Sequence, residues 1–173
     1  EALDHFVRLN ELDSTYVRAQ PRGLVVHWVA GNVPVLGMLS ALQSLLCKNA
    51  NLLKVSHVSA GLLPQLLQGL ADVQYTNSQG RMVDGKVIAG AMAAVYTDRR
   101  DHEAAHALSA AADIRVALGG REAVENVMSL PRRLGTEDIV FGPKTSFAVV
   151  GVEQLADTGA ARQTAMAIAR DTT

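Results

Sequence analysis

The fold follows first from residues 21–46, which read PRGLVVHWVAGNVPVLGMLSALQSLL. The apolar run LVVHWV at 24–29 is bounded on both sides by turn-forming residues, and this pattern predicts a buried strand. After Asn32 and Pro34, leucines recur at helical spacing, at positions 36, 39, 42, 45 and 46. Asparagine favours a helix N-cap and proline is tolerated in the first turn, so we predict a strand followed directly by a helix.

The same alternation of strand and helix continues along the chain. Further strands are predicted at 51–56, 92–97, 114–118, 138–141 and 146–150, and further helices at 60–70, 101–112, 121–130 and 153–170, with a polar loop at 77–86. This alternation predicts an α/β fold, with a Rossmann-like, doubly wound, mostly parallel sheet and helices on both faces. No repeat or linker interrupts the pattern, so we expect residues 1–173 to form one domain.

Composition excludes several classes of function. Of the 173 residues 49% are hydrophobic, and 16 Lys and Arg face 17 Asp and Glu, for a formal net charge of -1. Such a globular composition without a basic surplus argues against nucleic acid and anionic membranes as partners. No apolar run reaches the roughly 18 residues of a membrane span, and no signal peptide is visible. A lone cysteine, Cys47, cannot form an internal disulfide, so we expect a cytoplasmic protein.

Ligands of doubly wound sheets bind beyond the carboxyl ends of the strands. Three predicted strand-to-helix junctions lie there, at residues 31–34, 54–57 and 118–120. A helix that begins at such a junction presents free backbone N–H groups to phosphates. The G-x-G-x-x-G fingerprint of dinucleotide-binding folds is absent, so the residues alone indicate a nucleotide-binding domain without choosing the nucleotide.

Four segments, in order, resemble the aldehyde dehydrogenase superfamily. They are HWVAGNVPVLG (27–37), NANLLKVS (49–56), ADIRVALGGREAV (112–124) and EDIVFGPKTSFAVVG (137–151). Within the superfamily they are most similar to acyl-CoA reductases related to the fatty-acid reductase of bacterial luminescence. The resemblance implies the nicotinamide-nucleotide-binding domain of a reductase that converts an acyl-CoA or acyl-protein thioester to an aldehyde, and a homo-oligomer in the intact enzyme.

Asn32 falls where the superfamily keeps an asparagine two residues before proline. The resemblance implies that its side-chain amide donates a hydrogen bond to the oxyanion that forms when a cysteine attacks the acyl carbonyl. A fixed neutral donor suits this task because the charge develops only in the transition state. The alternative is a plain helix N-cap, and the two roles are compatible.

The resemblance also assigns cofactor-binding residues. Lys54 matches a lysine that contacts the adenosine ribose, and many NAD-preferring members carry glutamate where this chain has His57. Without that carboxylate nothing repels a 2′-phosphate, which Lys54, Ser56 or protonated His57 could hold, so we expect NADP as cofactor. Gly119 and Gly120 match glycines that let the cofactor approach the backbone. The alternatives are an exposed strand-end lysine and a tight turn that needs glycine.

Two further positions bear on the chemistry. The general-base glutamate of hydrolytic aldehyde dehydrogenases is replaced by Val140, which cannot activate water and suits a reductase. In the family the nucleophilic cysteine follows a helix like that at 160–170, so we expect it beyond Thr173 and expect the chain to be an inactive piece of a longer enzyme. Cys47 lies near the end of the first helix among leucines, where we expect a small packing residue.

A rival motif is the literal H-E-x-x-H at 102–106. On a helix its two histidines share one face and could bind zinc with Glu103 as base, and Glu122 or Glu125 could supply a third ligand of a hydrolase. The stretch is alanine-rich and follows Asp-Arg-Arg-Asp at 98–101, which is more typical of a solvated helix. A third possibility is a non-catalytic α/β interaction domain.

Overall fold

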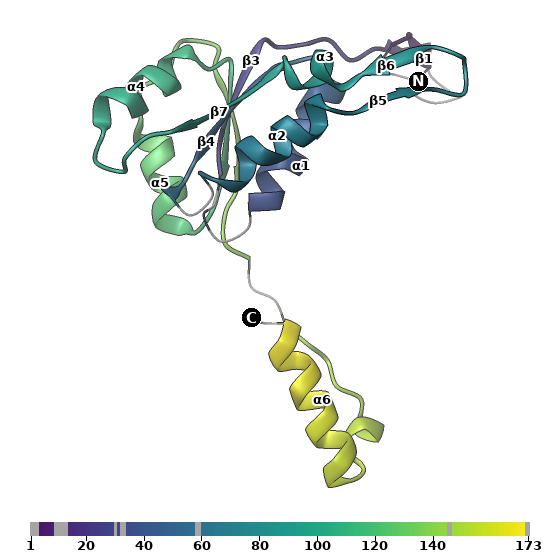
Figure 1. Cartoon of the computed structure of the whole chain (residues 1–173). Coiled ribbons are helices and arrows are strands. Elements are labelled where there is room, and N and C mark those ends of the chain that lie inside the picture. Colours follow the sequence, from purple (N-terminus) through teal and green to yellow (C-terminus); the bar gives the residue numbers. More distant parts are fainter. Residues whose placement is uncertain are drawn as a thin grey trace. The chain divides into compact units, whose positions relative to one another are not determined.

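The computed structural model describes residues 4–8, 14–29, 31, 34–57, 60–144 and 147–171. The chain divides into two compact units, Glu1–Pro143 and Lys144–Thr173, and each is described by itself (Figure 1).

A five-stranded parallel sheet forms the centre of the first unit (Figure 1). Its strands are β3 (Leu24–Trp28), β4 (Ala50–Val55), β7 (Met92–Tyr96), β8 (Ile114–Leu118) and β9 (Glu137–Phe141). Their spatial order is β7-β4-β3-β8-β9, and every neighbouring pair is parallel. The chain therefore builds outward from β3 to β7, then returns to the other side of β3, which confirms the predicted doubly wound sheet.

Helices cover both faces of this sheet, as predicted. They are α1 (Pro34–Leu46), α2 (Leu62–Ala71), α3 (Gly85–Ala89), α4 (His102–Ala111) and α5 (Arg121–Ser129). Apolar side chains of α1, α2 and α3 pack with Leu53 and Val55 on one face, and those of α4 and α5 pack with Val26 and Ala117 on the other. None of the helices in the described ranges is both long and apolar enough to cross a membrane.

Two small hairpins depart from the predictions. The predicted loop at 77–86 is in fact a turn between β5 (Gln74–Thr76) and β6 (Met82–Asp84), followed by α3. The Asn77 side chain closes the turn by accepting hydrogen bonds from the backbone of Gln79 and Arg81. Near the N-terminus β1 (Val7–Arg8) pairs with β2 (Tyr16–Val17). Strands this short carry too few residues for a period-2 pattern to be read from the sequence.

The C-terminal unit contradicts one predicted strand. Residues 147–150 form no strand, and Phe147 and Val149 are 87% and 86% exposed. Apolar alternation makes a strand only where a neighbouring backbone pairs with it, and no pairing forms for these described residues. The predicted helix at 153–170 is instead a 3-10 turn, Val152–Leu155, and then α6 (Thr158–Asp171). The Asp157 carboxylate, which accepts from the Ala160 N–H, marks the break between them.

Candidate cofactor site

The carboxyl ends of the five strands form one edge of the sheet. The parallel register aligns Trp28 with Lys54 on one side and with Ala117 on the other. Because β4 and β8 flank β3 and the chain winds in opposite directions from it, the order reverses between β3 and β8. Doubly wound folds bind ligands outside the sheet at this point, so the edge is the candidate site.

The first loop of the edge, after β3, lies against the end of β4. A Cβ at Gly31 would stand 2.8 Å from the Ser56 Oγ, closer than real Cβ atoms approach, so a larger residue there would displace the Ser56 side chain. Ser56 itself is partly buried. Asn32, the predicted oxyanion donor, lies outside the described residues, and its two interpretations stay open.

Lys54 is the next-to-last residue of β4 and is partly buried. Burial lowers the pKa of its ammonium group, the positive charge of Arg99 lowers it further, and Asp98 acts in the opposite direction. The ammonium group is therefore partly desolvated close to a second cation. A bound anion would offset both effects, as the Asp98 carboxylate already does in part.

His57 follows β4 and is exposed. Its ring meets that of Tyr96, the last residue of β7, edge to face, with 6.0 Å between the ring centroids and 74° between the planes. Lys54, Ser56 and His57 thus lie at the end of one strand, beside the end of the next. No carboxylate stands among these three positions.

The loop between β7 and α4 contributes a residue that the sequence analysis missed. Arg99 forms an ion pair with Glu122, in the first turn of α5, and both side chains are largely exposed. The carboxylates of Asp98 and Asp101 accept hydrogen bonds from backbone N–H groups. Asp98 accepts from the Arg100 N–H, and Asp101 accepts from the Ala104 N–H at the start of α4. The Asp-Arg-Arg-Asp run was the available signal, since it follows a strand at the ligand-binding edge.

Gly119 and Gly120 join β8 to α5. Gly119 has a φ of +156° and its N–H donates to the Phe141 carbonyl. Gly120 is the N-cap of α5, where no side chain caps the helix and nothing lies within 4 Å of a Cβ built on it. The first turn of α5 therefore offers backbone N–H groups beside open space, a suitable arrangement for a phosphate.

The rival metal motif gains no further ligand. His102 and His106 lie on α4 and are exposed. Throughout the described part of the chain, no three His, Cys, Asp or Glu side chains gather closely enough to hold a metal ion. Glu122, one of the suggested third ligands, pairs with Arg99 instead.

Two other predicted positions have ordinary surroundings. Val140 pairs with Ala117 in the edge strand β9 and is 45% exposed. Cys47 is a partly buried free cysteine just after α1, and its N–H donates to the Ser44 carbonyl. These surroundings are those of a strand residue for Val140 and of a packing residue for Cys47.

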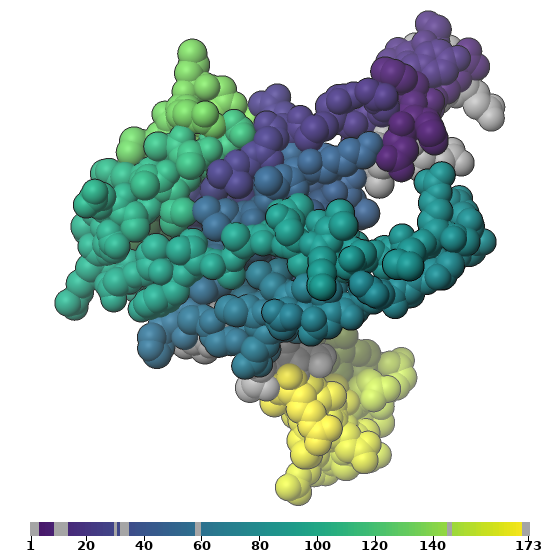
Figure 2. Space-filling model, turned by 45° about the horizontal axis from the view of Figure 1, so that its top comes forward, coloured from purple at the N-terminus to yellow at the C-terminus, as the bar shows by residue number. Residues whose placement is uncertain are grey.

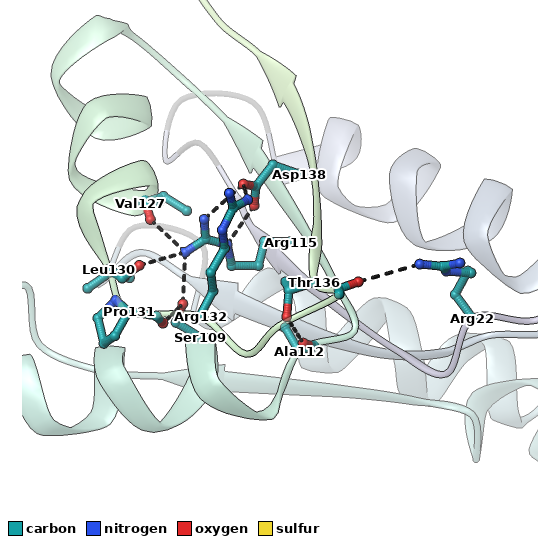
Figure 3. Close-up of polar contacts among 11 residues, drawn as sticks. Arg22, Ser109, Ala112, Arg115, Val127, Leu130, Pro131, Arg132, Thr136 and Asp138 are labelled. Atoms are coloured by element: carbon teal, nitrogen blue, oxygen red, sulfur yellow. Dashed lines mark hydrogen bonds and ion pairs between the residues drawn. The ribbon is translucent and has the colours of Figure 1, made fainter.

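At the opposite, amino end of the sheet lies a buried ion network (Figure 3). The Arg115 side chain is 1% exposed, and its Nε and Nη2 donate to the two carboxylate oxygens of Asp138 at 2.6 and 3.0 Å. Its Nη1 donates to the Ser109 hydroxyl and to the carbonyls of Val127 and Leu130, at 2.9–3.1 Å. Arg115 thus joins β8, β9 and the ends of α4 and α5, and its role is structural.

Comparison with known proteins agrees with the resemblance seen in the sequence. All of residues 1–173 match the family model of acyl-CoA reductase (LuxC). Over 140 residues the chain is 31% identical to the long-chain acyl-protein thioester reductase of Photorhabdus luminescens, which covers 80% of this chain and 27% of that protein. Over 137 residues it is 32% identical to the enzyme of the same name from Aliivibrio fischeri, covering 78% of this chain and 26% of the relative. The chain spans about a quarter of the length of these relatives and belongs to the acyl-CoA reductase (LuxC) family.

Proposed function

We propose that this chain is the NADP-binding part of a longer acyl-thioester reductase that releases an aldehyde. The observation that carries the proposal is the carboxyl edge of the sheet, where Lys54 and His57 lie at the end of β4 and the charge of Arg99 acts on the Lys54 ammonium group. The resemblance adds that His57 stands where many NAD-preferring members of the superfamily carry glutamate. Besides the Asp98 carboxylate, whose charge also acts on Lys54, the donor set there consists of cations, a hydroxyl and backbone N–H groups. It fits a cofactor that carries several phosphates and no positive charge at its adenosine end.

Each end of the site has a task in this proposal. Lys54, Ser56 and His57 bind the ribose and its 2′-phosphate. Gly119 and Gly120 let the cofactor approach the protein backbone at the start of α5. Bound NADPH supplies the hydride that reduces the acyl group. Val140, at the position of the general base in hydrolytic members of the superfamily, has no group that could activate water for hydrolysis.

The remaining chemistry is proposed for the longer enzyme. There a cysteine outside residues 1–173 takes the acyl group, and Asn32 donates to the resulting oxyanion. In a full-length reductase, Asn32→Ala should lower kcat by about 10²–10³, and Asn32→Asp should be at least as harmful because it adds a negative charge. If Asp preserves activity and Ala lowers only thermal stability, Asn32 is a helix cap alone.

Cofactor binding by the purified chain tests the proposal. Titration followed by NADPH and NADH fluorescence should give tighter binding of NADPH. His57→Glu should shift the ratio of the two dissociation constants toward NADH by about 10- to 100-fold, because the new carboxylate repels the 2′-phosphate. His106→Glu, an equal charge change on an exposed histidine of α4, should leave the ratio unchanged. Absence of binding for both cofactors would overturn the proposal, and an unchanged ratio in His57→Glu would remove position 57 from the ribose site.

Activity of the isolated chain provides a second check. We expect no thioester reduction above background by residues 1–173, since Cys47 follows α1 rather than lying at the carboxyl edge. Reduction of an acyl-CoA that Cys47→Ser abolishes would show that the nucleophile had been misassigned.

A further inference from the structure

We propose that Arg99 is a specificity-determining residue that binds the 2′-phosphate of NADP and exchanges its ion pair with Glu122 for that phosphate. This inference rests on the proposed function and adds a residue outside the four segments that carry the resemblance. Its ligand is a phosphate monoester dianion on the ribose.

The sheet register brings the loop that carries Arg99 next to the ribose end of the site. β7 lies directly beside β4, with Lys54 opposite Val95 and Val55 opposite Tyr96. The chain therefore leaves β7 next to the segment that leaves β4, and the edge-to-face contact of Tyr96 with His57 joins the two exits. Arg99 is three residues beyond Tyr96, and its charge acts on the Lys54 ammonium.

The ion pair of Arg99 with Glu122 can be given up at small cost. The side chains are 76% and 78% exposed, so water and salt screen the attraction, and such pairs stabilise proteins little. A guanidinium group binds a phosphate through two parallel hydrogen bonds. We expect this contact to outweigh the screened ion pair with the Glu122 carboxylate. Asp98 and Asp101 compete less for Arg99 because each accepts a hydrogen bond from a backbone N–H of its own loop or helix start.

Two cations on adjacent strand ends distinguish the 2′-phosphate from the rest of the cofactor. The pyrophosphate is common to NAD and NADP, so a residue bound to it would affect both cofactors alike. Lys54 lies at the end of β4 and the loop of Arg99 follows β7, whereas Gly119 and Gly120 follow β8, on the other side of β3. The Arg99 side chain nevertheless reaches Glu122 in the first turn of α5, so the comparison of the two cofactors is what separates contact with the 2′-phosphate from contact with the pyrophosphate. An effect of Arg99 confined to NADPH is therefore the signature of this inference.

The experiment compares Arg99→Ala with a neighbouring control in the purified chain. Fluorescence titration should show NADPH bound about 10-fold or more weakly by Arg99→Ala, with NADH binding changed less than about twofold. Arg99→Lys should retain part of the NADPH affinity. Arg100→Ala, which removes an equal charge one residue away, should leave both affinities near wild type.

A competition titration and a variant expected to bind NADPH more tightly test the same contact in two further ways. Adenosine 2′,5′-bisphosphate should displace NADPH more strongly than 5′-AMP does, and Arg99→Ala should remove this difference. Glu122→Gln should tighten NADPH binding up to about twofold because Arg99 loses its competing partner. Circular dichroism checks that each variant is folded.

The outcomes separate this inference from the function on which it rests. If wild type binds neither cofactor, the proposed function fails. If wild type binds NADPH and Arg99→Ala weakens both cofactors equally, or neither, then Arg99 is not the 2′-phosphate residue and the proposed function stands. A loss in Arg100→Ala equal to that in Arg99→Ala would reduce the effect to general charge and would also overturn the inference.

Discussion

The two ends of the central sheet differ in how their polar groups are satisfied. At the amino end, polar side chains are buried and bound to several partners, as Arg115 is. At the carboxyl end, glycines and exposed or half-buried cations line the loops, and the Arg99–Glu122 pair is open to solvent. Figure 2 gives a space-filling view of one face of the molecule, coloured by residue number. The difference separates the part of the molecule that specifies the fold from the part available for a ligand.

Further side chains at the amino end bind several partners, although not all of them are as deeply buried as Arg115. The side-chain Oδ1 of Asn49 accepts from the backbone N–H groups of Arg22 and Gly23, at 2.6 and 3.2 Å. The Asp113 carboxylate accepts from the Leu24 N–H at 2.8 Å and pairs with Arg133. These side chains bind backbone that enters β3, so they fix where the sheet begins. A buried group that lost such a partner would destabilise the fold by more than the bond itself contributes.

The largest expected effect is at Arg115. Arg115→Ala should destabilise the chain by about 3–5 kcal/mol, because it leaves the 15%-exposed Asp138 carboxylate, the Ser109 hydroxyl and two carbonyls without their shared donor. Urea unfolding followed by circular dichroism measures the change. The matched control is Arg132→Ala, which removes the half-exposed partner of the same carboxylate and should cost no more than about 1 kcal/mol. Equal losses in the two variants would contradict a special role for burial.

A second prediction concerns pH and the centre of the sheet. His27 is fully buried in β3, with Nδ1 2.9 Å from the Ser40 hydroxyl and Nε2 3.0 Å from the Asn51 side-chain oxygen. Because the Asn51 amide nitrogen donates to the Asn49 carbonyl, the Asn51 oxygen is an acceptor, so Nε2 carries the proton and Nδ1 accepts from Ser40. Burial lowers the pKa of His27 below 6.5, and the hydrogen bond to Asn51 partly opposes this.

The sign of the pH effect follows from that shift. Below pH 6.5 the unfolded chain binds a proton at position 27 that the folded chain does not, so stability is present above pH 6.5 and is lost as the pH falls. The slope contributed by this one group is at most about 1.4 kcal/mol per pH unit. Urea unfolding between pH 7.5 and 5.5 should show the loss, and His27→Gln should flatten it. The exposed His106→Gln should retain the wild-type slope.

The two glycines after β8 offer a contrast within the carboxyl end. Gly119→Ala should cost about 1–2 kcal/mol, because φ is +156° and the new Cβ would lie 3.3 Å from the Ala123 Cβ. Gly120→Ser should leave stability unchanged or raise it slightly, since φ is −68°, the space is open and serine is a good N-cap. Thermal unfolding measures both. If phosphate binds at α5, Gly120→Ser should still weaken NADPH binding, and a variant with normal affinity would remove that position from the site.

Much of the fold was predictable because local patterns and tertiary structure agree. The apolar run at 24–29 and the leucine spacing after Pro34 gave β3 and α1 nearly to their ends, since a strand buried on both faces has no polar alternation to mislead. Two predictions, the loop in place of the hairpin of β5 and β6 and the strand at 146–150, were wrong for one shared reason. Strand pairing depends on a neighbouring backbone, which hydrophobicity along the chain does not record.

The candidate site was predictable only where a family motif names the residue. Lys54, His57 and Gly119 lie at the carboxyl edge where the resemblance assigned them, whereas the use made of that edge stays a prediction. Arg99 was missed because a charged run between a strand and a helix has the same appearance whether it is solvated or faces a site. Its significance depends on β7 lying beside β4, which is a property of strand order.

The smallest expected effect is on the stability contributed by the Arg99–Glu122 pair. A double-mutant cycle of Arg99→Ala, Glu122→Ala and the double variant should give a coupling energy below about 0.5 kcal/mol, because the side chains are 76% and 78% exposed and salt screens them. The corresponding cycle for Arg115 and Asp138 should give several times more, since both partners there are shielded from water. Urea unfolding at low and at 0.5 M salt measures both cycles, and only the exposed pair should lose its coupling in salt. A coupling at Arg99 as large as that at Arg115 would mean that the carboxyl end is held as tightly as the amino end, and Arg99 would then not be free to exchange Glu122 for a phosphate.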